Sequence, residues 1–298
     1  MAFRDFAESI DFGERAQRWA DALYFGPQDQ PDSYPFGIAH GIRGVGLVRR
    51  NSVDFIAILT LGKPPEQRLD LTELLNPPQY PDIFNAIRSV LPDETFDRVC
   101  ILPIPQIIRS ASAGTFVRGA LQGTAGPGVT WAGGRAGFLT AGHVAVGQVS
   151  LTDASGNSYG NVVHAFDPAQ GAGSAPNVDV AVIEVPKGAP TTSFASGAPI
   201  KGNSAVDLHL NSGPKSSTVL AMIGWYDWPL AGRYVDLYMT NAACTVPGDS
   251  GSVVTSAGTS DAIGIVVGGT ATFTSFIQVI DTQIKALNAV TGLNSLKL

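Results

Sequence analysis

Short runs of β-branched and aromatic residues, separated by turns rich in Gly, Ser and Asp, dominate the chain from Ala113 onward. Helical periodicity is nearly absent there, and regularly spaced short strands are typical of antiparallel barrels and sandwiches. The runs form two sets of six on either side of a stretch rich in Pro, Gly, Ser and Thr, Pro186–Asn203. The first set comprises Thr115–Arg118, Val129–Trp131, Gly137–Thr140, Val149–Thr152, Asn161–Ala165 and Asp179–Val185. The second comprises Val206–Leu210, Ser217–Ile223, Tyr234–Met239, Ser252–Thr255, Ala262–Val267 and Ser275–Ile280.

The first 112 residues follow a different pattern, in which helical and strand periods alternate. The expected elements are an amphipathic helix ending at Gly26, two strands within residues 41–65 about a turn near Asn51–Ser52, a helix from Pro81 and a strand at Arg98–Leu102. Pro103–Ser112 is the expected connection to the β-rich region. We therefore predict an N-terminal α+β domain and linker over residues 1–112 and a mainly β domain over residues 113–298. Thr282–Thr291 is expected to form a short helix near the C-terminus.

Composition narrows the class of protein. The chain has 298 residues, of which 44% are hydrophobic and only 15% charged, with a formal net charge of −6. An acidic chain without clustered Lys and Arg is a poor nucleic-acid binder. No apolar run approaches the ~20 residues of a membrane helix, and acidic residues occupy the region where a signal peptide would be apolar. We expect a cytoplasmic protein with no membrane association, whose cysteines, Cys100 and Cys244, are free.

Three fragments carry candidate chemistry. FLTAGHV places His143 just after an apolar strand, NVDVAVIEV places Asp179 at the start of another, and VPGDSGSVV places Ser250 in a glycine-flanked turn. A serine hydroxyl needs a base to become a nucleophile, and histidine titrates in the right range. A carboxylate on the other imidazole nitrogen fixes the tautomer. Backbone N–H groups in the turn can stabilise an oxyanion, and Gly248 can adopt the backbone shape that this requires.

These fragments resemble the motifs of the chymotrypsin-like (trypsin-like) serine proteases. TAGH at Thr140–His143, DVAVI at Asp179–Ile183 and GDSGS at Gly248–Ser252 occur in the order found in that family. The resemblance covers about residues 113–298 and implies two six-stranded antiparallel β-barrels with the site between them. It implies that His143 is the general base, Asp179 its orienting carboxylate and Ser250 the nucleophile. The N–H groups of Gly248 and Ser250 would then form the oxyanion hole.

The resemblance also indicates where a peptide substrate would bind. It implies an edge strand at Gly264–Gly269, to which an extended peptide adds by main-chain hydrogen bonds. The expected substrate-binding residues are Cys244, Thr245, Val267, Gly268 and Gly269. No Asp or Glu stands near Cys244, where the pocket floor is expected. We therefore predict an uncharged or apolar residue before the cut rather than Arg or Lys.

Departures from the family pattern are informative. The paired cysteines of secreted members are missing, and no IVGG-like N-terminus exists to pair with Asp249 after cleavage. Val267 stands where many members carry a serine that supports the aspartate. Only 36 residues separate His143 from Asp179, as in compact bacterial members. The linker near Ser110–Gly114 is a segment whose cleavage the sequence leaves open.

Alternatives remain at each level. Asp167 in HAFDP is the alternative triad carboxylate, although it has the pattern of a turn before Pro168. His40, His164 and His209 lack motif context and are expected to be structural. No Cys/His set has metal-ligand spacing, so we expect neither metal nor cofactor. The leading hypothesis is a serine endopeptidase acting on peptide or protein substrates. The alternative is a regulatory or binding module on a protease scaffold, in which the N-terminal domain recruits a partner or gates the cleft.

Overall fold

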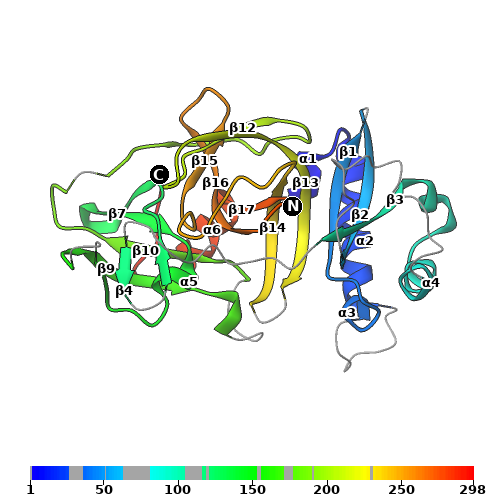
Figure 1. Cartoon of the computed structure of the whole chain (residues 1–298), viewed down its shortest axis with the longest axis horizontal. Coiled ribbons are helices and arrows are strands. Elements are labelled where there is room, and N and C mark those ends of the chain that lie inside the picture. Colours follow the sequence, from blue (N-terminus) through cyan, green and yellow to red (C-terminus); the bar gives the residue numbers. More distant parts are fainter. Residues whose placement is uncertain are drawn as a thin grey trace.

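A computed structural model describes the chain at residues 2–26, 36–50, 52–62, 81–104, 116–118, 121–152, 156–170, 177–189, 191–228 and 231–298. Three parts follow one another along the long axis of the molecule (Figure 1). A β-rich part with α5, β7, β9 and β10 lies at one end, a second β-rich part with β12–β17 lies in the middle, and the N-terminal elements lie at the other end (Figure 1).

The middle part is a closed barrel. Its strands are β12 (Ala205–Leu208), β13 (Lys215–Trp228), β14 (Gly232–Thr240), β15 (Val253–Ser256), β16 (Asp261–Gly269) and β17 (Ser275–Val279). They pair in the order β12-β15-β16-β17-β14-β13, and β13 pairs back with β12. Every strand of this ring thus pairs with at least two others, so the ring is closed rather than an open sheet. We call this ring the second barrel.

The end part is a five-stranded sheet, which we call the first barrel. Its strands are β6 (Gly128–Trp131), β7 (Arg135–Thr140), β8 (Ser150–Thr152), β9 (Ser158–Phe166) and β10 (Val180–Glu184), in the order β6-β7-β10-β9-β8. A hairpin of β4 (Phe116–Arg118) and β5 (Leu121–Gly123) forms a separate two-stranded sheet, and its β4 contacts β8 at the end of this order. We count the hairpin and the segment that joins it to β6 as part of the first barrel. The predicted double β-barrel of the chymotrypsin-like type is therefore confirmed, except that the sheet of the first barrel has five strands instead of the six expected.

The remaining described elements of the two barrels are two helices, two 3-10 turns and one short strand. They are α5 (Gly142–Ala145), α6 (Ile280–Asn288), the 3-10 turns η4 (Ala132–Gly134) and η5 (Pro168–Gln170), and the short strand β11 (Ala195–Ser196), which pairs with β16. The late helix predicted at Thr282–Thr291 is confirmed, but it begins two residues earlier, directly after β17. Because α6 packs on the first barrel as well as the second, its buried Leu287 joins a cluster with Val180 and Ile265.

The N-terminal region consists of α1 (Ala2–Phe6), α2 (Ile10–Phe25), α3 (Phe36–Ala39), β1 (Gly44–Arg50), β2 (Val53–Leu61), α4 (Pro81–Val90), the 3-10 helix η3 (Asp93–Arg98) and β3 (Val99–Ile104). Ser9 caps α2 through a hydrogen bond from Phe12 N, and Gly26 ends it at a φ of 76°. The predicted helix–strand–strand–helix–strand order is confirmed.

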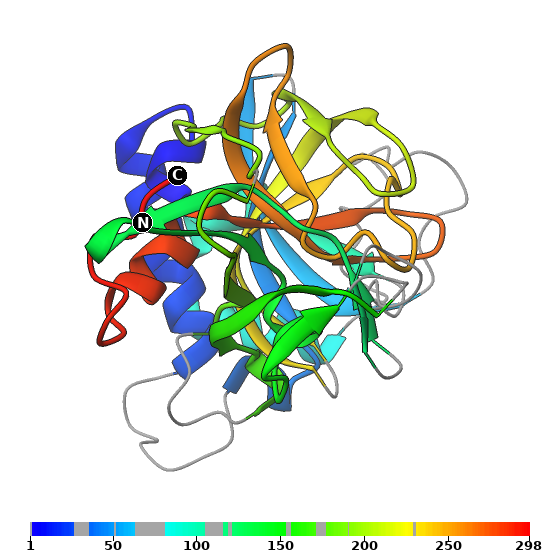
Figure 2. The ribbon, with the colours of Figure 1, turned by 90° about the vertical axis from the view of Figure 1, so that its left-hand side faces the viewer.

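The N-terminal strands are continuous with the second barrel. β1 pairs antiparallel with β13 from Gly44↔Tyr226 to Val48↔Ala221, and β2 and β3 extend the same sheet beyond it. In the turned view, the blue strands lie behind the second barrel while the first barrel lies in front (Figure 2). The division predicted at residue 112, the connection beyond Ile104 and the Ser110–Gly114 linker fall outside the described residues. The boundary stays a prediction, but the strands on its two sides share one sheet.

Cys100 and Cys244 are both buried free thiols. Burial raises the pKa of the Cys100 thiol to about 12. Among the described residues, no helix is long and apolar enough to span a membrane. Within the same residues, no group of three or more His, Cys, Asp or Glu side chains is arranged to hold a metal ion.

Candidate active site

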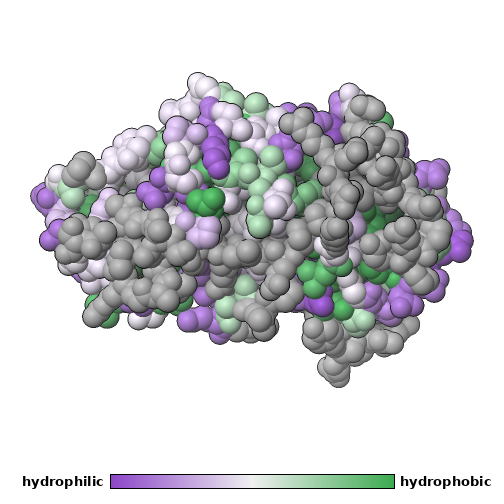
Figure 3. Space-filling model, in the orientation of Figure 1, coloured by the Kyte–Doolittle hydropathy of each residue, from purple (hydrophilic) through white to green (hydrophobic). Residues whose placement is uncertain are grey.

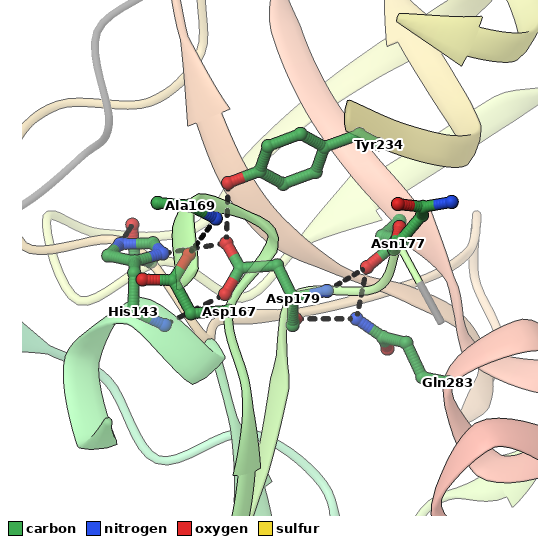
Figure 4. A network of polar contacts seen from close by, with 9 residues as sticks. His143, Asp167, Ala169, Asn177, Asp179, Tyr234 and Gln283 are labelled. Atoms are coloured by element: carbon green, nitrogen blue, oxygen red, sulfur yellow. Dashed lines mark hydrogen bonds and ion pairs between the residues drawn. The ribbon is translucent and has the colours of Figure 1, made fainter. Parts of the chain in front are cut away.

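The register of the first barrel brings His143 and Asp179 together. β7 and β10 are antiparallel with Ala181 opposite Thr140, so the residue before β10 lies beside the turn that follows β7. Asp179 Oδ2 lies 2.7 Å from His143 Nδ1, and Asp179 Oδ1 accepts a 2.9 Å hydrogen bond from His143 N (Figure 4). The carboxylate therefore fixes both the ring and the backbone of the histidine.

Ser250 reaches the same imidazole from the second barrel. It lies in the loop between β14 and β15, and its Oγ is 3.1 Å from His143 Nε2. An ionised carboxylate only accepts hydrogen bonds, so Nδ1 carries the imidazole proton and Nε2 is left to accept from the serine hydroxyl. The structure thus joins the three predicted residues into one hydrogen-bonded chain across the two barrels.

The three side chains are enclosed. His143 is 1% exposed, and Asp179 and Ser250 are 0% exposed. Low local dielectric strengthens the polar contacts of this chain of groups. It also means that any substrate has to displace part of the protein to reach the Ser250 hydroxyl.

Asp179 is held by residues that the sequence reasoning did not identify. Tyr234 donates its hydroxyl to Asp179 Oδ2 at 3.2 Å (Figure 4). Asp179 N donates to Gln278 Oε1 at 2.7 Å, and Gln283 Nε2 donates to the Asp179 carbonyl at 3.1 Å. Gln278 Nε2 in turn donates to the Asn177 and Val235 carbonyls. These three side chains come from β14, β17 and α6, so the second barrel and its helix fix both the carboxylate and the backbone of Asp179.

The loop around Ser250 has the backbone conformation that its glycines predict. Gly248 has a φ of 102° and Gly251 a φ of 95°, in the left-handed region where residues with a Cβ are strained. A Cβ at Gly251 would also collide with the Thr124 carbonyl and the Thr140 hydroxyl. Within the part of the chain that the structure describes, the N–H groups of Gly248 and Ser250 have no protein acceptor.

Buried hydrogen bonds brace this loop from two sides. Asp249 Oδ2 accepts from Val246 N at 2.9 Å and from Ser212 Oγ at 2.8 Å, and its Oδ1 accepts from Ser212 N at 2.9 Å. From the first barrel, Thr124 Oγ1 donates to the Gly248 carbonyl at 2.7 Å and Thr124 N donates to the Ser250 carbonyl at 2.8 Å. Asp249 therefore has three neutral donors and is satisfied without a free amino group.

The predicted pocket segment contains hydroxyl groups. Ser275 Oγ accepts from Cys244 N at 2.9 Å and from Thr245 N at 3.1 Å, and it lies 3.0 Å from Thr245 Oγ1. Thr245 Oγ1 faces Gly269, where a Cβ would approach it to 2.6 Å. Behind the segment, Lys215 Nζ donates to the Cys244 carbonyl at 2.5 Å.

The predicted edge strand is shorter than expected. Gly264 and Ile265 pair with both β15 and β17, and Val266 is bonded to Ser252 and Gly251 on one side and pairs with β17 on the other. Within the predicted edge segment Gly264–Gly269, the part that has no partner among the described strands on the side of β15 is Val267–Gly269. The Val267 side chain is buried in the core with Phe276, so only its backbone can face a peptide.

The other candidate residues lie outside the hydrogen-bonded group formed by His143, Asp179 and Ser250. Asp167 begins the turn that its sequence predicted and accepts from Ala169 N at 3.0 Å (Figure 4). His164 packs against Phe166, His209 Nε2 lies 3.1 Å from Thr255 Oγ1, and the His40 ring packs at a tilt against Phe36. Burial lowers the pKa of His164.

Comparisons with known proteins relate the chain to serine proteases at low similarity. No protein-family model and no curated protein matches it. Similar solved structures include a Nocardiopsis protease (24% identity, 63% of this chain and 98% of that one, TM-score 0.46) and a chymotrypsin from Cellulomonas bogoriensis (22%, 60% and 96%, 0.43). Another is a glutamic acid-specific serine protease (22%, 58% and 95%, 0.48). Each comparison leaves more than a third of this chain unmatched.

Proposed function

We propose that the chain is a serine endopeptidase that hydrolyses peptide bonds through an acyl-enzyme. The observation that carries the proposal is the placement of His143 between Asp179 and Ser250, at 2.7 and 3.1 Å. Such a constellation is recognised by its geometry and roles rather than by sequence position. The TAGH and GDSGS motifs around two of the three residues support the same activity.

In the proposed reaction, Ser250 Oγ attacks the peptide carbonyl while its proton passes to His143 Nε2. Asp179 stabilises the resulting imidazolium. The N–H groups of Gly248 and Ser250 donate to the tetrahedral oxyanion. Collapse of the intermediate breaks the C–N bond, and the His143 proton goes to the leaving amine. Water then attacks the ester while His143 takes up its proton, and His143 returns that proton to Ser250 as the acyl group leaves.

Covalent labelling tests this activity. A fluorophosphonate forms a bond to an activated serine, so diisopropyl fluorophosphate should label the wild type at Ser250 and leave Ser250→Ala unlabelled. We expect Ser250→Ala to lower kcat by about 10⁴-fold or more on a peptide substrate. Equal labelling of both proteins, or no labelling of the folded wild type between pH 7 and 9, would contradict the proposal.

We further propose an uncharged or apolar residue before the cut. Cys244, Thr245 and Ser275 offer no carboxylate to a cationic side chain, and Lys215 lies directly behind them. Such a site has no counter-ion for Arg or Lys. A panel of fluorogenic peptides that differ only in this residue measures kcat/KM for each. A preference for Arg or Lys would refute the proposed specificity.

A regulatory role for residues 1–112 is a second candidate, favoured by the almost complete burial of the site. We propose that this region gates the cleft or recruits a partner to a cytoplasmic enzyme. On the face drawn in Figure 3, hydrophobic residues of the described part of the chain lie in groups between hydrophilic ones, so a partner would meet a mixed surface there. Comparing turnover of the full chain with that of a chain lacking residues 1–112 tests gating, because equal turnover and equal substrate choice would exclude it.

A further inference from the structure

A tyrosine hydroxyl from the second barrel enters the hydrogen-bonded chain at its acidic end. Tyr234 lies on β14 and is 0% exposed. Its hydroxyl donates to Asp179 Oδ2 at 3.2 Å, and the same oxygen lies 2.7 Å from His143 Nδ1 (Figure 4). The phenol and the imidazole therefore share one carboxylate oxygen.

The surroundings of Tyr234 fix its ring. It lies opposite Tyr226 in the β13–β14 pair, and its ring centroid is 5.1 Å from that of Trp228. The next residue along β14, Val235, donates its N–H to the Asn177 carbonyl at 3.2 Å. This ties the start of β14 to the segment that leads into Asp179, so the hydroxyl and the carboxylate are held in register by backbone contacts.

The contact also supplies a hydroxyl donor that the family pattern would place at position 267 and that this sequence lacks there. Position 267, where related sequences were expected to carry a serine, is a valine buried in the barrel core. A fully buried carboxylate requires hydrogen-bond donors, because an unsatisfied buried charge is costly. Tyr234 supplies a hydroxyl to Asp179 from β14 rather than from β16.

We propose that Tyr234 is a positioning residue that sets the acid–base balance of the Asp179–His143 pair; this rests on the proposed function for its kinetic consequences. While His143 is neutral, the pair carries one buried negative charge, and the phenol stabilises that state. Without the phenol the negative charge is less well satisfied. Proton uptake by the imidazole then becomes more favourable, and the neutral base that attack requires forms only at higher pH.

The test replaces Tyr234 by Phe and compares it with Tyr226→Phe. Tyr226 is the matched control because it is an equally buried neighbour whose hydroxyl has no hydrogen-bond partner in the described structure. The readout is the rate constant for labelling by diisopropyl fluorophosphate against pH. We expect Tyr234→Phe to lower the plateau about tenfold, as for a lost hydrogen bond to a charged group. Its acid limb should move to higher pH by several tenths of a unit, whereas Tyr226→Phe should change neither. A merely structural role would leave the midpoint of the limb in place.

Two further measurements separate the possible failures. Nuclear magnetic resonance titration of the His143 ring reports the same midpoint without any reaction. If the wild type is not labelled but Tyr234→Phe still shifts the His143 titration, the proposed hydrolase activity is refuted and the role of Tyr234 stands. If Tyr234→Phe unfolds, 3-fluorotyrosine at position 234 provides a stronger donor of nearly the same shape and should move the midpoint to lower pH. Identical midpoints in the wild type and the modified proteins would overturn the inference.

Discussion

The two barrels contribute to the candidate site in different ways. The first barrel supplies the hydrogen-bonded pair of His143 and Asp179, next to the ends of two paired strands. The second supplies Ser250 in a glycine-shaped turn, together with Tyr234, which donates to the Asp179 carboxylate, and Gln278, which accepts from Asp179 N. Hydrogen bonds cross between them in both directions, from Tyr234 to Asp179 and from Thr124 to the Gly248 carbonyl. Neither barrel therefore contains a complete site, and the accuracy of the geometry depends on how the barrels are fastened together.

Two buried aspartates, Asp179 and Asp249, illustrate how the contributions of the two barrels differ. Asp179 contacts a histidine that can take up a proton and donors from distant strands. Among the described residues, the Asp249 carboxylate accepts from neutral donors, namely Val246 N and the backbone and hydroxyl of Ser212. In the proposed reaction the first carboxylate stabilises the His143 imidazolium, while the second holds the loop around Ser250. Substitutions of the two groups of residues should accordingly differ in size and in kind.

The largest effect is expected from Asp179→Asn. An amide in place of the carboxylate favours the wrong imidazole tautomer and does not stabilise the imidazolium, so kcat should fall by about 10⁴-fold with little change in KM. The control is Asp167→Asn, which alters the alternative carboxylate in the same barrel and should leave kcat within a few-fold of the wild type. Steady-state kinetics on a cleaved peptide measures both. A larger loss for Asp167→Asn would transfer the role to that residue.

A smaller loss is expected from Ser212→Ala in the second barrel. The substitution removes one of the three donors to buried Asp249. Loss of a hydrogen bond to a charged group should lower kcat by about tenfold or more. The looser loop should lower kcat without moving the pH profile. Ser216→Ala is the matched control, because that hydroxyl also donates to a carboxylate, Asp207, but on the exposed surface. A shifted pH profile for Ser212→Ala would blur the distinction between the two aspartates.

The parts of the site that were predictable are those whose signal is local. TAGH and GDSGS place His143 and Ser250 because a tight turn needs particular residues at adjacent positions. The alternation of short apolar runs likewise identified most strands of both barrels, although it missed the short strands β5 and β11. Tyr234, Gln278 and Ser212 had no such signal, because their contacts with Asp179 and Asp249 join residues 37 to 99 positions apart. An aromatic residue in a strand reads as core until the partner of its hydroxyl is known.

The N-terminal region illustrates the same limit on a larger scale. Its helices and strands followed from periodicity, since Gly26 and Pro81 mark helix ends by local chemistry. The sequence suggested a separate domain, however, because nothing in β1 identifies the strand beside it. Pairing of Gly44–Val48 with β13 joins residues far apart in the chain. Topology of this kind depends on which apolar edges meet, and a single sequence carries little information about that.

Thr124→Val tests the brace that runs from the first barrel to the second. The substitution keeps the shape of the side chain and removes the hydroxyl that donates to the Gly248 carbonyl, while the bond from Thr124 N to Ser250 remains. A neutral hydrogen bond contributes about 1 kcal/mol, so kcat should fall several-fold. Thr259→Val removes an exposed hydroxyl that donates to a carbonyl of the second barrel and should leave kcat unchanged. Equal kcat values for both variants would show that the brace is dispensable.

The smallest effect concerns the acid stability of the first barrel. Burial lowers the pKa of His164, whose Nε2 is buried without a partner in the described structure. As pH falls below about 6.5, the unfolded chain takes up a proton at this residue before the folded chain does, so stability decreases until the lowered folded pKa is passed. His164→Gln should therefore reduce the drop in Tm between pH 7.5 and 5.5 by on the order of 1 °C. His209→Gln in the second barrel is the control, because His209 contacts the Thr255 hydroxyl rather than lying unpartnered. If the two variants lose the same Tm on acidification, His164 does not distinguish the barrels.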